Sequence, residues 1–220
     1  MIDIPDKKMA YDFENGFYLT CSPGRVGKLI AHYELYKKAL KLPGVIIECG
    51  VFKGASFTRL AIFRELFESS GTRKIIGFDT FNVFPESTYI EDKSKLASFI
   101  GEAGNKSISK EQLEQVLDNK QCGNMIELIE GDILETVPDY IDKHPELKIA
   151  LLHLDVDIYE PSKCSLQYFY ARLVKGGILI LDDYGIFPGA TKAIDDFFED
   201  KVETPLKFPF SHAPSYIIKD

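Results

Sequence analysis

The feature that most constrains the fold of this 220-residue chain is a repeated alternation of strand-length apolar runs with helical stretches. Residues 24–40 carry apolar side chains at helical spacing, and Pro43 and Gly44 end that helix. Strands are then predicted at 45–50, 74–79, 125–130, 149–155 and 177–182. Because such alternation is typical of parallel strands covered by helices on both faces, the sequence predicts an α/β fold with a mostly parallel sheet.

A long segment after the second predicted strand, residues 82–121, interrupts this alternation. It contains Ser109 followed three residues later by Gln112, a spacing that resembles a helix capping box and predicts a helix over 109–117. A loop of that length without regular structure is unusual in a compact domain. We therefore expect 82–121 to form a partly helical lid over the active face.

The C-terminal segment differs in kind from the rest of the chain. Residues 205–218 combine proline-rich connections with β-type residues, which suits an antiparallel hairpin at the edge of the sheet. A chain of this length is long enough for one substantial domain and short for two. We expect a single domain over 1–220, in which 1–43 form an N-terminal helical or lid segment.

The composition argues against several classes of protein. The formal net charge is −8 and the basic residues are scattered, which argues against nucleic-acid binding. No apolar run reaches the roughly 18 residues of a membrane span, and the N-terminus lacks the apolar core of a secretory signal. The four cysteines are widely separated and have no zinc-ligand spacing. We expect a soluble, cytoplasmic protein with reduced thiols.

A glycine-punctuated loop follows the first predicted strand. In an open doubly wound sheet, ligands bind beyond the carboxyl ends of the strands, where the strand order reverses between the first and fourth strands. This rule predicts that residues 48–54 lie beside Asp155. Gly50 and Gly54 would let a cofactor approach the backbone and the N-terminus of the next helix. The loop lacks the G-x-G-x-x-G dinucleotide pattern, so a tight turn without a ligand is the alternative.

Two further predicted strands end in acidic residues. Asp79 ends the second strand, where a carboxylate can accept hydrogen bonds from both hydroxyls of a ribose. Asp132 follows the third strand, where a carboxylate could receive an adenine amino group. A helix cap or a turn is the alternative for such aspartates. Acidic residues at three successive strand ends favour an adenosine pocket.

Two acidic pairs, Asp155-Val156-Asp157 and Asp182-Asp183, end the fourth and fifth apolar runs. Carboxylates are costly to bury near one another, because each is desolvated and like charges repel. Asp155, Asp182 and Asp183 at two adjacent strand ends would suit a hard ion such as Mg²⁺. Asp157 is then free to act as a general base, with a charge at a helix N-terminus as the alternative.

The histidines add little to this predicted site. His153 lies two residues before Asp155 on the same face of its strand, so it either contacts the cofactor or packs, and packing is the simpler interpretation. His32, His144 and His212 form no ligand spacing with one another.

At these residues the chain resembles the macrocin O-methyltransferase family, small S-adenosylmethionine-dependent enzymes that methylate sugar hydroxyls. The resemblance runs from about Arg25 to Phe198. It is carried by segments 47–56, 78–81, 131–132, 154–161, 176–184, 189–190 and 193–197. It implies a Rossmann-like class I methyltransferase fold with a seven-stranded sheet.

The resemblance also implies roles for individual residues. Mg²⁺ would be bound by Asp155, Asp182 and Asp183, and Asp157 would be the general base. The methyl donor, S-adenosylmethionine, would be held by Glu48, Gly50, Ser56, Asp79, Phe81, Asp132 and Asp155. The N-terminal region and segment 82–121 are short beside the macrolide and aminocoumarin enzymes. The expected acceptor is therefore a hydroxylated small molecule, a sugar, with no requirement for a large antibiotic.

Two other functions stand as alternatives. An Asp-x-Asp pair after an apolar strand also suits a Mg²⁺-dependent phosphatase or phosphoryl-transfer enzyme, although that motif usually follows the first strand of its domain. A non-catalytic S-adenosylmethionine-binding protein is the other, yet three clustered carboxylates repel one another without an ion. The aromatic-rich residues 11–19 would cover either the active site or a partner subunit, as in a homodimer.

Overall fold

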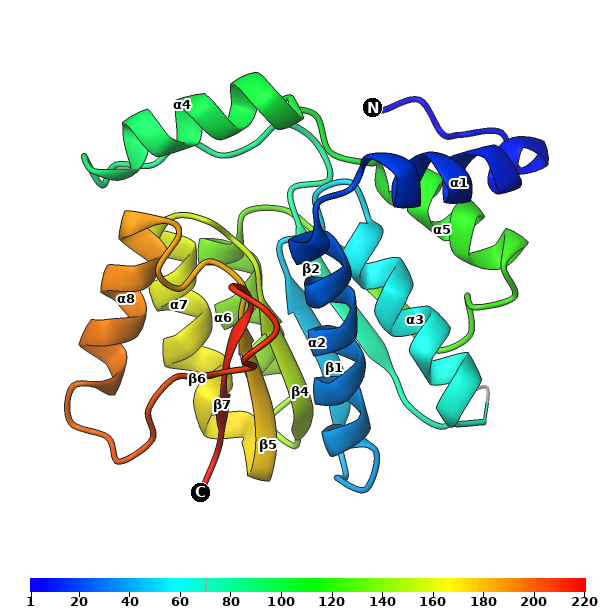
Figure 1. The fold of residues 1–220 in the computed structure, drawn as a ribbon. Helices are drawn as coiled ribbons and strands as arrows, with labels where there is room; N and C mark the ends of the chain where they lie inside the picture. The colour runs from blue at the N-terminus through cyan, green and yellow to red at the C-terminus, as the bar shows by residue number, and fades with distance from the viewer. Residues whose placement is uncertain (70) are drawn as a thin grey trace.

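The computed structural model describes residues 1–69 and 71–220. Within them, the centre is a seven-stranded sheet in the order β3-β2-β1-β4-β5-β7-β6 (Figure 1). The strands are β1 (Val45–Cys49), β2 (Ile75–Asp79), β3 (Ile126–Glu130), β4 (Ile149–Leu154), β5 (Leu173–Leu181), β6 (Leu206–Lys207) and β7 (Ser215–Ile218). The first five pair in parallel, whereas β7 is antiparallel to β5 and to β6. The predicted α/β class and the antiparallel C-terminal hairpin are confirmed.

The strand order reverses between β1 and β4, which pair directly. In this parallel pair Glu48 lies opposite His153. Gly50 follows the end of β1, and the N–H of Asp155 donates to the carbonyl of Cys49 at 2.9 Å. The predicted binding position therefore lies at the carboxyl ends of the two central strands.

Helices cover both faces of the sheet. One face packs against α2 (Pro23–Ala39), α3 (Ala55–Phe67) and α5 (Lys110–Asn119), and the other against α6 (Ile133–Lys143), α7 (Tyr159–Phe169) and α8 (Pro188–Phe198). Because side chains alternate along a strand, Ile46 packs in one core layer and Ile47 in the other. The apolar strand residues are buried in these two core layers, whereas the polar residues that follow the strands lie at the site.

The segment between β2 and β3 contains two helices, and α5 is the inner one. It begins at the predicted capping box, in which Ser109 Oγ accepts from the Gln112 N–H and the Gln112 side chain accepts from the Ser109 N–H. Leu113 and Leu117 of α5 are fully buried in the core layer that contains α3. This helix is therefore part of the core, and it does not cover the active face.

The other helix, α4 (Asp92–Ala103), lies across the carboxyl edge of the sheet (Figure 1). It buries Asp92 and Leu96, and its remaining residues are exposed or half-buried. By its position (Figure 1), α4 is the part of segment 82–121 that could cover the active face, and its role as a lid stays a prediction.

The N-terminal residues form a short η1 (Lys7–Met9) and α1 (Ala10–Thr20), and none of the described residues of α1 is buried. Tyr11 and Leu19 are largely exposed, whereas Phe17 lines the cavity described below. The homodimer suggested by this aromatic segment stays a prediction. Among the helices of residues 1–69 and 71–220, none is long and apolar enough to cross a membrane.

Candidate active site

A cavity of about 690 Å³ opens at the carboxyl edge of the sheet, with α4 as one wall. Its lining includes eight residues that the sequence singled out: Gly50, Ser56, Asp79, Asp132, Asp155, Asp157, Asp182 and Asp183. Glu48 and Phe81 are not among the described residues that line it, because both side chains are buried in the protein. The structure thus brings together residues from the ends of β1, β2, β3, β4 and β5.

Gly50 allows the ends of β1 and β4 to approach each other. Its φ is +86°, and a Cβ at this position would lie 1.7 Å from the carbonyl oxygen of Asp155. The Gly50 N–H donates to the carbonyl of Phe78 on the other side, at 2.9 Å. Glycine is therefore required both for the backbone conformation and for the close approach.

Glu48 acts from behind the cavity wall. Its side chain is fully buried, and its Oε1 accepts a 2.6 Å hydrogen bond from Ser56 Oγ. Its Oε2 lies 3.4 Å from His153 Nδ1. Ser56 lines the cavity, so Glu48 is connected to a ligand there through the Ser56 hydroxyl.

Asp79 fixes the loop after β1. Its Oδ2 accepts the N–H groups of Val51 at 2.7 Å and Phe52 at 2.8 Å, and its Oδ1 accepts the N–H of Phe81 at 2.7 Å. These bonds hold Phe52 and Phe81 in left-handed backbone conformations, at φ 49° and 50°. Since an ionised carboxylate offers about four acceptor positions, Asp79 can still accept a ribose hydroxyl.

Asp132 has the capping role that was the alternative for these aspartates. It precedes α6, and its Oδ1 accepts the N–H of Leu134 at 2.9 Å. Its side chain is exposed and lines the cavity. A contact with an adenine amino group is compatible with this cap and stays a prediction.

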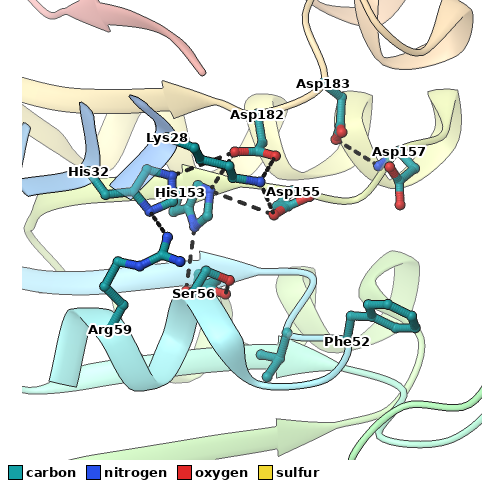
Figure 2. Close-up of polar contacts among 12 residues, drawn as sticks. Lys28, His32, Phe52, Ser56, Arg59, His153, Asp155, Asp157, Asp182 and Asp183 are labelled. Carbon is teal, nitrogen blue, oxygen red and sulfur yellow. Dashed lines mark hydrogen bonds and ion pairs between the residues drawn. The ribbon is translucent and has the colours of Figure 1, made fainter. Parts of the chain in front are cut away.

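Three carboxylates converge at the ends of β4 and β5. Ligand oxygens of Asp155, Asp157 and Asp183 lie within 4.8 Å of one another. The N–H of Asp157 donates to Asp183 Oδ2 at 2.9 Å, and Asp157 is held at φ 61° (Figure 2). Such a strained backbone at a cluster of like charges is typical of functional sites.

The electrostatics of these three residues favour protonation in the absence of a cation. Burial and then the Asp182 charge raise the pKa of Asp155 to about 8. Burial raises the pKa of Asp157 to about 6, and burial together with Asp157 raises that of Asp183 well above its usual range. A divalent cation in this cavity would offset the repulsion among the ionised carboxylates and so lower their pKa values.

Asp182, unlike these three residues, forms a close ion pair with a lysine. Lys28 of α2 lies with its Nζ 2.5 Å from Asp182 Oδ2 and 3.9 Å from Asp155 Oδ2. Although burial raises it, the charge of Lys28 and the two neighbouring histidines bring the pKa of Asp182 well below its usual range. Lys28 therefore occupies the position between two of the three predicted metal ligands.

Two histidines complete this second cluster. His32 and His153 meet edge to face with ring centroids 4.9 Å apart, and both point a ring nitrogen at Asp182 Oδ1, at 3.6 and 3.5 Å (Figure 2). Burial lowers the pKa of His32 to about 3. Burial also acts to lower that of His153, but its contacts with Asp182 and Glu48 outweigh this and raise it to about 10.

These two histidines and Asp182 have the composition of a metal site, but the proton positions disfavour one. Arg59 Nη1 lies 3.1 Å from His32 Nδ1. Arginine can only donate, so His32 Nδ1 must accept and its proton lies on Nε2, facing Asp182. A protonated nitrogen offers no lone pair to a metal. The cluster is therefore a charged network that surrounds Asp182.

Sequence reasoning missed Lys28, His32 and Arg59. The available signal was the four-residue spacing of Lys28 and His32, which puts both on one helix face with the buried Leu35 and Tyr36. His153 packs in the interior as predicted, with 0% exposure, although its neighbours are charged.

Four phenylalanines form an aromatic wall of the cavity. Phe52, Phe84 and Phe99 have ring centroids 5.7 to 6.2 Å apart, and Phe99 meets Phe187 edge to face at 5.8 Å. All four line the cavity. Such a wall suits a ligand with an apolar face, while the polar groups of the cavity would fix its orientation.

Comparison with known proteins identifies similar sequences. The sequence model of the macrocin-O-methyltransferase (TylF) family matches residues 29–208. A Streptomyces olivaceus enzyme, 8-demethyl-8-(2,3-dimethoxy-alpha-L-rhamnosyl)-tetracenomycin-C 4'-O-methyltransferase, is 28% identical over 156 residues, which are 66% of this chain and 54% of that enzyme. Demethyldecarbamoylnovobiocin O-methyltransferase of Streptomyces niveus is 25% identical over 162 residues, 71% of this chain and 58% of that enzyme. The chain thus spans little more than half the length of these curated relatives.

Solved structures agree with this result. CalS11, a calicheamicin methyltransferase, has a TM-score of 0.79 and 29% identity, and the match covers 99% of this chain and 86% of CalS11. Its apo structure, described as a TDP-rhamnose 3'-O-methyltransferase of calicheamicin biosynthesis, has a TM-score of 0.73 with 29% identity over 99% of this chain and 88% of that one.

Proposed function

Because this chain belongs to the macrocin O-methyltransferase (TylF) family, we propose that it transfers the methyl group of S-adenosylmethionine to a hydroxyl of a sugar or sugar-containing small molecule. The observation that carries the proposal is a single cavity that joins the loop at Gly50 to the carboxylates of Asp155, Asp157 and Asp183. A sugar acceptor is supported by the relatives, since the names of the Streptomyces olivaceus enzyme and of CalS11 both contain a rhamnose unit.

The methyl donor would bind along the ends of β1, β2 and β3. Gly50 leaves the backbone open to it, and Ser56 offers a hydroxyl that Glu48 orients from behind. Asp79 would accept a ribose hydroxyl and Asp132 the adenine amino group. Phe81 would contribute indirectly, because its N–H orients the Asp79 carboxylate. Asp155, at the end of β4, would border the sulfonium end of the donor.

Asp155, Asp182 and Asp183 would hold Mg²⁺, which would supply Lewis-acid polarisation of the acceptor hydroxyl. The fit is supported by geometry, because ligand oxygens of Asp155 and Asp183 lie within 4.8 Å of each other. Burial and the neighbouring carboxylates raise the pKa values of both groups, and a bound cation would offset that repulsion. Lys28 is the competing cation, because its ammonium now lies between Asp155 and Asp182.

Asp157 would be the general base. With a pKa raised to about 6, it is mostly deprotonated at neutral pH and still basic enough to accept a proton from an alcohol. The bond from its N–H to Asp183 fixes its position beside the metal ligands. A sugar hydroxyl held between Asp157 and the aromatic wall would be aligned with the donor methyl group, and alignment supplies much of the rate.

Ligand-dependent melting of the purified protein tests the proposal first. S-adenosylhomocysteine should raise the melting temperature, because it would bind the native state, whereas phosphate and its analogues should not. A screen of nucleotide-activated sugars and simple glycosides, read by mass, should then give a product heavier by one methylene group. Stabilisation by phosphate analogues alone would instead favour the phosphoryl-transfer alternative.

Donor binding without any methylated product and without saturable Mg²⁺ binding in calorimetry would favour the non-catalytic alternative.

A further inference from the structure

Asp92, the first residue of α4, is a fully buried carboxylate outside the acidic cluster. Its Oδ1 accepts the N–H of Gly189 at 2.7 Å. Its Oδ2 accepts the N–H of Tyr159 at 3.1 Å and the hydroxyl of Ser87 at 3.0 Å. A buried carboxylate is tolerated only when its oxygens are satisfied, and here three donors satisfy them.

The two backbone donors belong to the N-termini of two helices. Tyr159 is the first residue of α7 and Gly189 is the second residue of α8. Because a helix N-terminus carries unpaired N–H groups and a positive partial charge, one carboxylate serves as a shared cap for both. Asp92 thereby joins α4 to the two elements that begin directly after the acidic loops.

The sequence distances to the acidic residues are short. Only Ile158 separates Asp157 from Tyr159, and residues 184–188 separate Asp183 from Gly189. A displacement of either helix N-terminus would move the attached loop, and with it Asp157 or Asp183.

Gly189 is shaped for this contact. A Cβ added there would meet three atoms of Asp92, the closest being Oδ2 at 2.1 Å.

The side of α4 that carries Asp92 also faces the cavity. Lys95, Ser98, Phe99, Glu102 and Ala103 line it, at the spacing of one helix face. The loop before α4 is also attached to the start of α7, since Glu160 Oε1 accepts the N–H of Thr88 at 3.1 Å. The position of this face over the site is therefore set at its N-terminal end by Asp92.

We propose that Asp92 is a positioning residue that holds the inner face of α4 as the acceptor-binding wall, in fixed relation to the loops of Asp157 and Asp183. This inference rests on the proposed function for the identity of the acceptor. The donor side of the cavity lies at β1, β2 and β3, whereas the hydrogen bonds of Asp92 run to Ser87, Tyr159 and Gly189 outside those strands. We therefore expect donor binding to be independent of this anchor.

Hydrogen exchange of the S-adenosylhomocysteine-bound protein tests the anchor without an acceptor. In Asp92→Ala, exchange of residues 87–103 and of the first turns of α7 and α8 should rise about tenfold or more, with S-adenosylhomocysteine affinity within about twofold of wild type. Glu91→Gln, an exposed neighbour, is the matched control and should exchange like wild type. Wild-type exchange in Asp92→Ala would overturn the inference.

Gly189→Ala provides a milder variant and a double-mutant cycle. Its clash is with Asp92, so it should also loosen α4, whereas adding Asp92→Ala should produce no further loss. Multiplying effects in the double variant would contradict the shared contact. With the acceptor found by the methyl-transfer screen, both single variants should raise the acceptor KM about tenfold and leave the donor KM within about twofold. Equal losses on both substrates would mean a general structural role and would overturn the proposal.

If wild-type protein fails to bind S-adenosylhomocysteine, the proposed function fails, whereas the exchange comparison in the unliganded protein still decides the role of Asp92.

Discussion

The ammonium of Lys28 lies 2.5 Å from Asp182, and this contact puts a protein cation where a divalent ion is expected. Lys28 belongs to α2 and lines the cavity. The charges of Asp155 and Asp182 outweigh the effect of burial and raise the pKa of Lys28, so the ammonium stays charged. Metal binding at Asp155 and Asp182 must therefore compete with it.

Replacing Lys28 with Met should strengthen metal binding. The ammonium and a divalent ion repel each other at this distance, so removing it should raise the affinity for Mn²⁺ or Mg²⁺ roughly tenfold, about 1.4 kcal/mol. Without metal the variant should melt at a lower temperature, because Asp182 loses its counter-ion. Calorimetry with Lys143→Met, which removes an exposed lysine paired with Asp139, provides the control. Weaker metal binding in Lys28→Met would contradict this account.

Asp157→Asn separates the general base from the metal ligands. The substitution keeps the shape of the side chain and removes its basicity, so kcat should fall about 10²- to 10⁴-fold. Metal affinity should change little, whereas Asp183→Asn should lose it. Asp139→Asn, an exposed aspartate, should be neutral in both assays. If Asp157→Asn loses metal binding as fully as Asp183→Asn, then Asp157 is a ligand and another base is needed.

Metal binding should depend on pH in a defined direction. The pKa of Asp155 is raised to about 8 and that of Asp183 well above its usual range, so both of these proposed ligands hold protons at about pH 5, and a metal must displace those protons. The apparent Mg²⁺ affinity should thus increase between about pH 5 and about pH 8. The rise in melting temperature on adding Mg²⁺, measured at several pH values, should follow the same course. A constant rise across this range would show that these carboxyl groups do not bind the ion.

Gly50→Ala should disrupt the junction of β1 and β4. Its Cβ would overlap the Asp155 carbonyl, and the positive φ adds backbone strain, so the free energy of unfolding should fall by about 3 kcal/mol or more. Gly16→Ala is a useful control, because nothing lies within 4 Å of the added Cβ in α1. That variant should be neutral or slightly stabilising. Denaturant unfolding of both proteins gives the comparison.

The parts of the site that were predictable from sequence follow from one rule. Parallel strands end at a common edge, so residues after apolar runs, such as Gly50, Asp79 and Asp155, must meet there. The contacts of Lys28 and His32 could not be predicted in the same way, because they depend on how far α2 is rotated about its axis. The hydrogen bonds of Asp79 could not be predicted either, because its partners are backbone N–H groups, which nearly every residue has.

Segment 82–121 illustrates the same limit. Its length and the Ser109 capping box predicted helical structure. The segment contains the helices α4 and α5, and the capping box is present at the start of α5. Which of its helices faces the cavity depends on long-range packing: Leu113 finds a place in the core, whereas Asp92 pairs with helix ends that lie far away in the sequence. Local patterns identify such an element and leave its position open.

The placement of α4 has a consequence for the acceptor specificity of the proposed methyltransferase. One short helix, anchored at Asp92 and outside the strand framework, presents five side chains to the cavity. Exchange of residues 93–103 as a cassette would alter those side chains and leave the sheet, the acidic loops and their anchor intact. If the proposed function holds, acceptor choice and catalytic chemistry would reside in separate parts of the molecule.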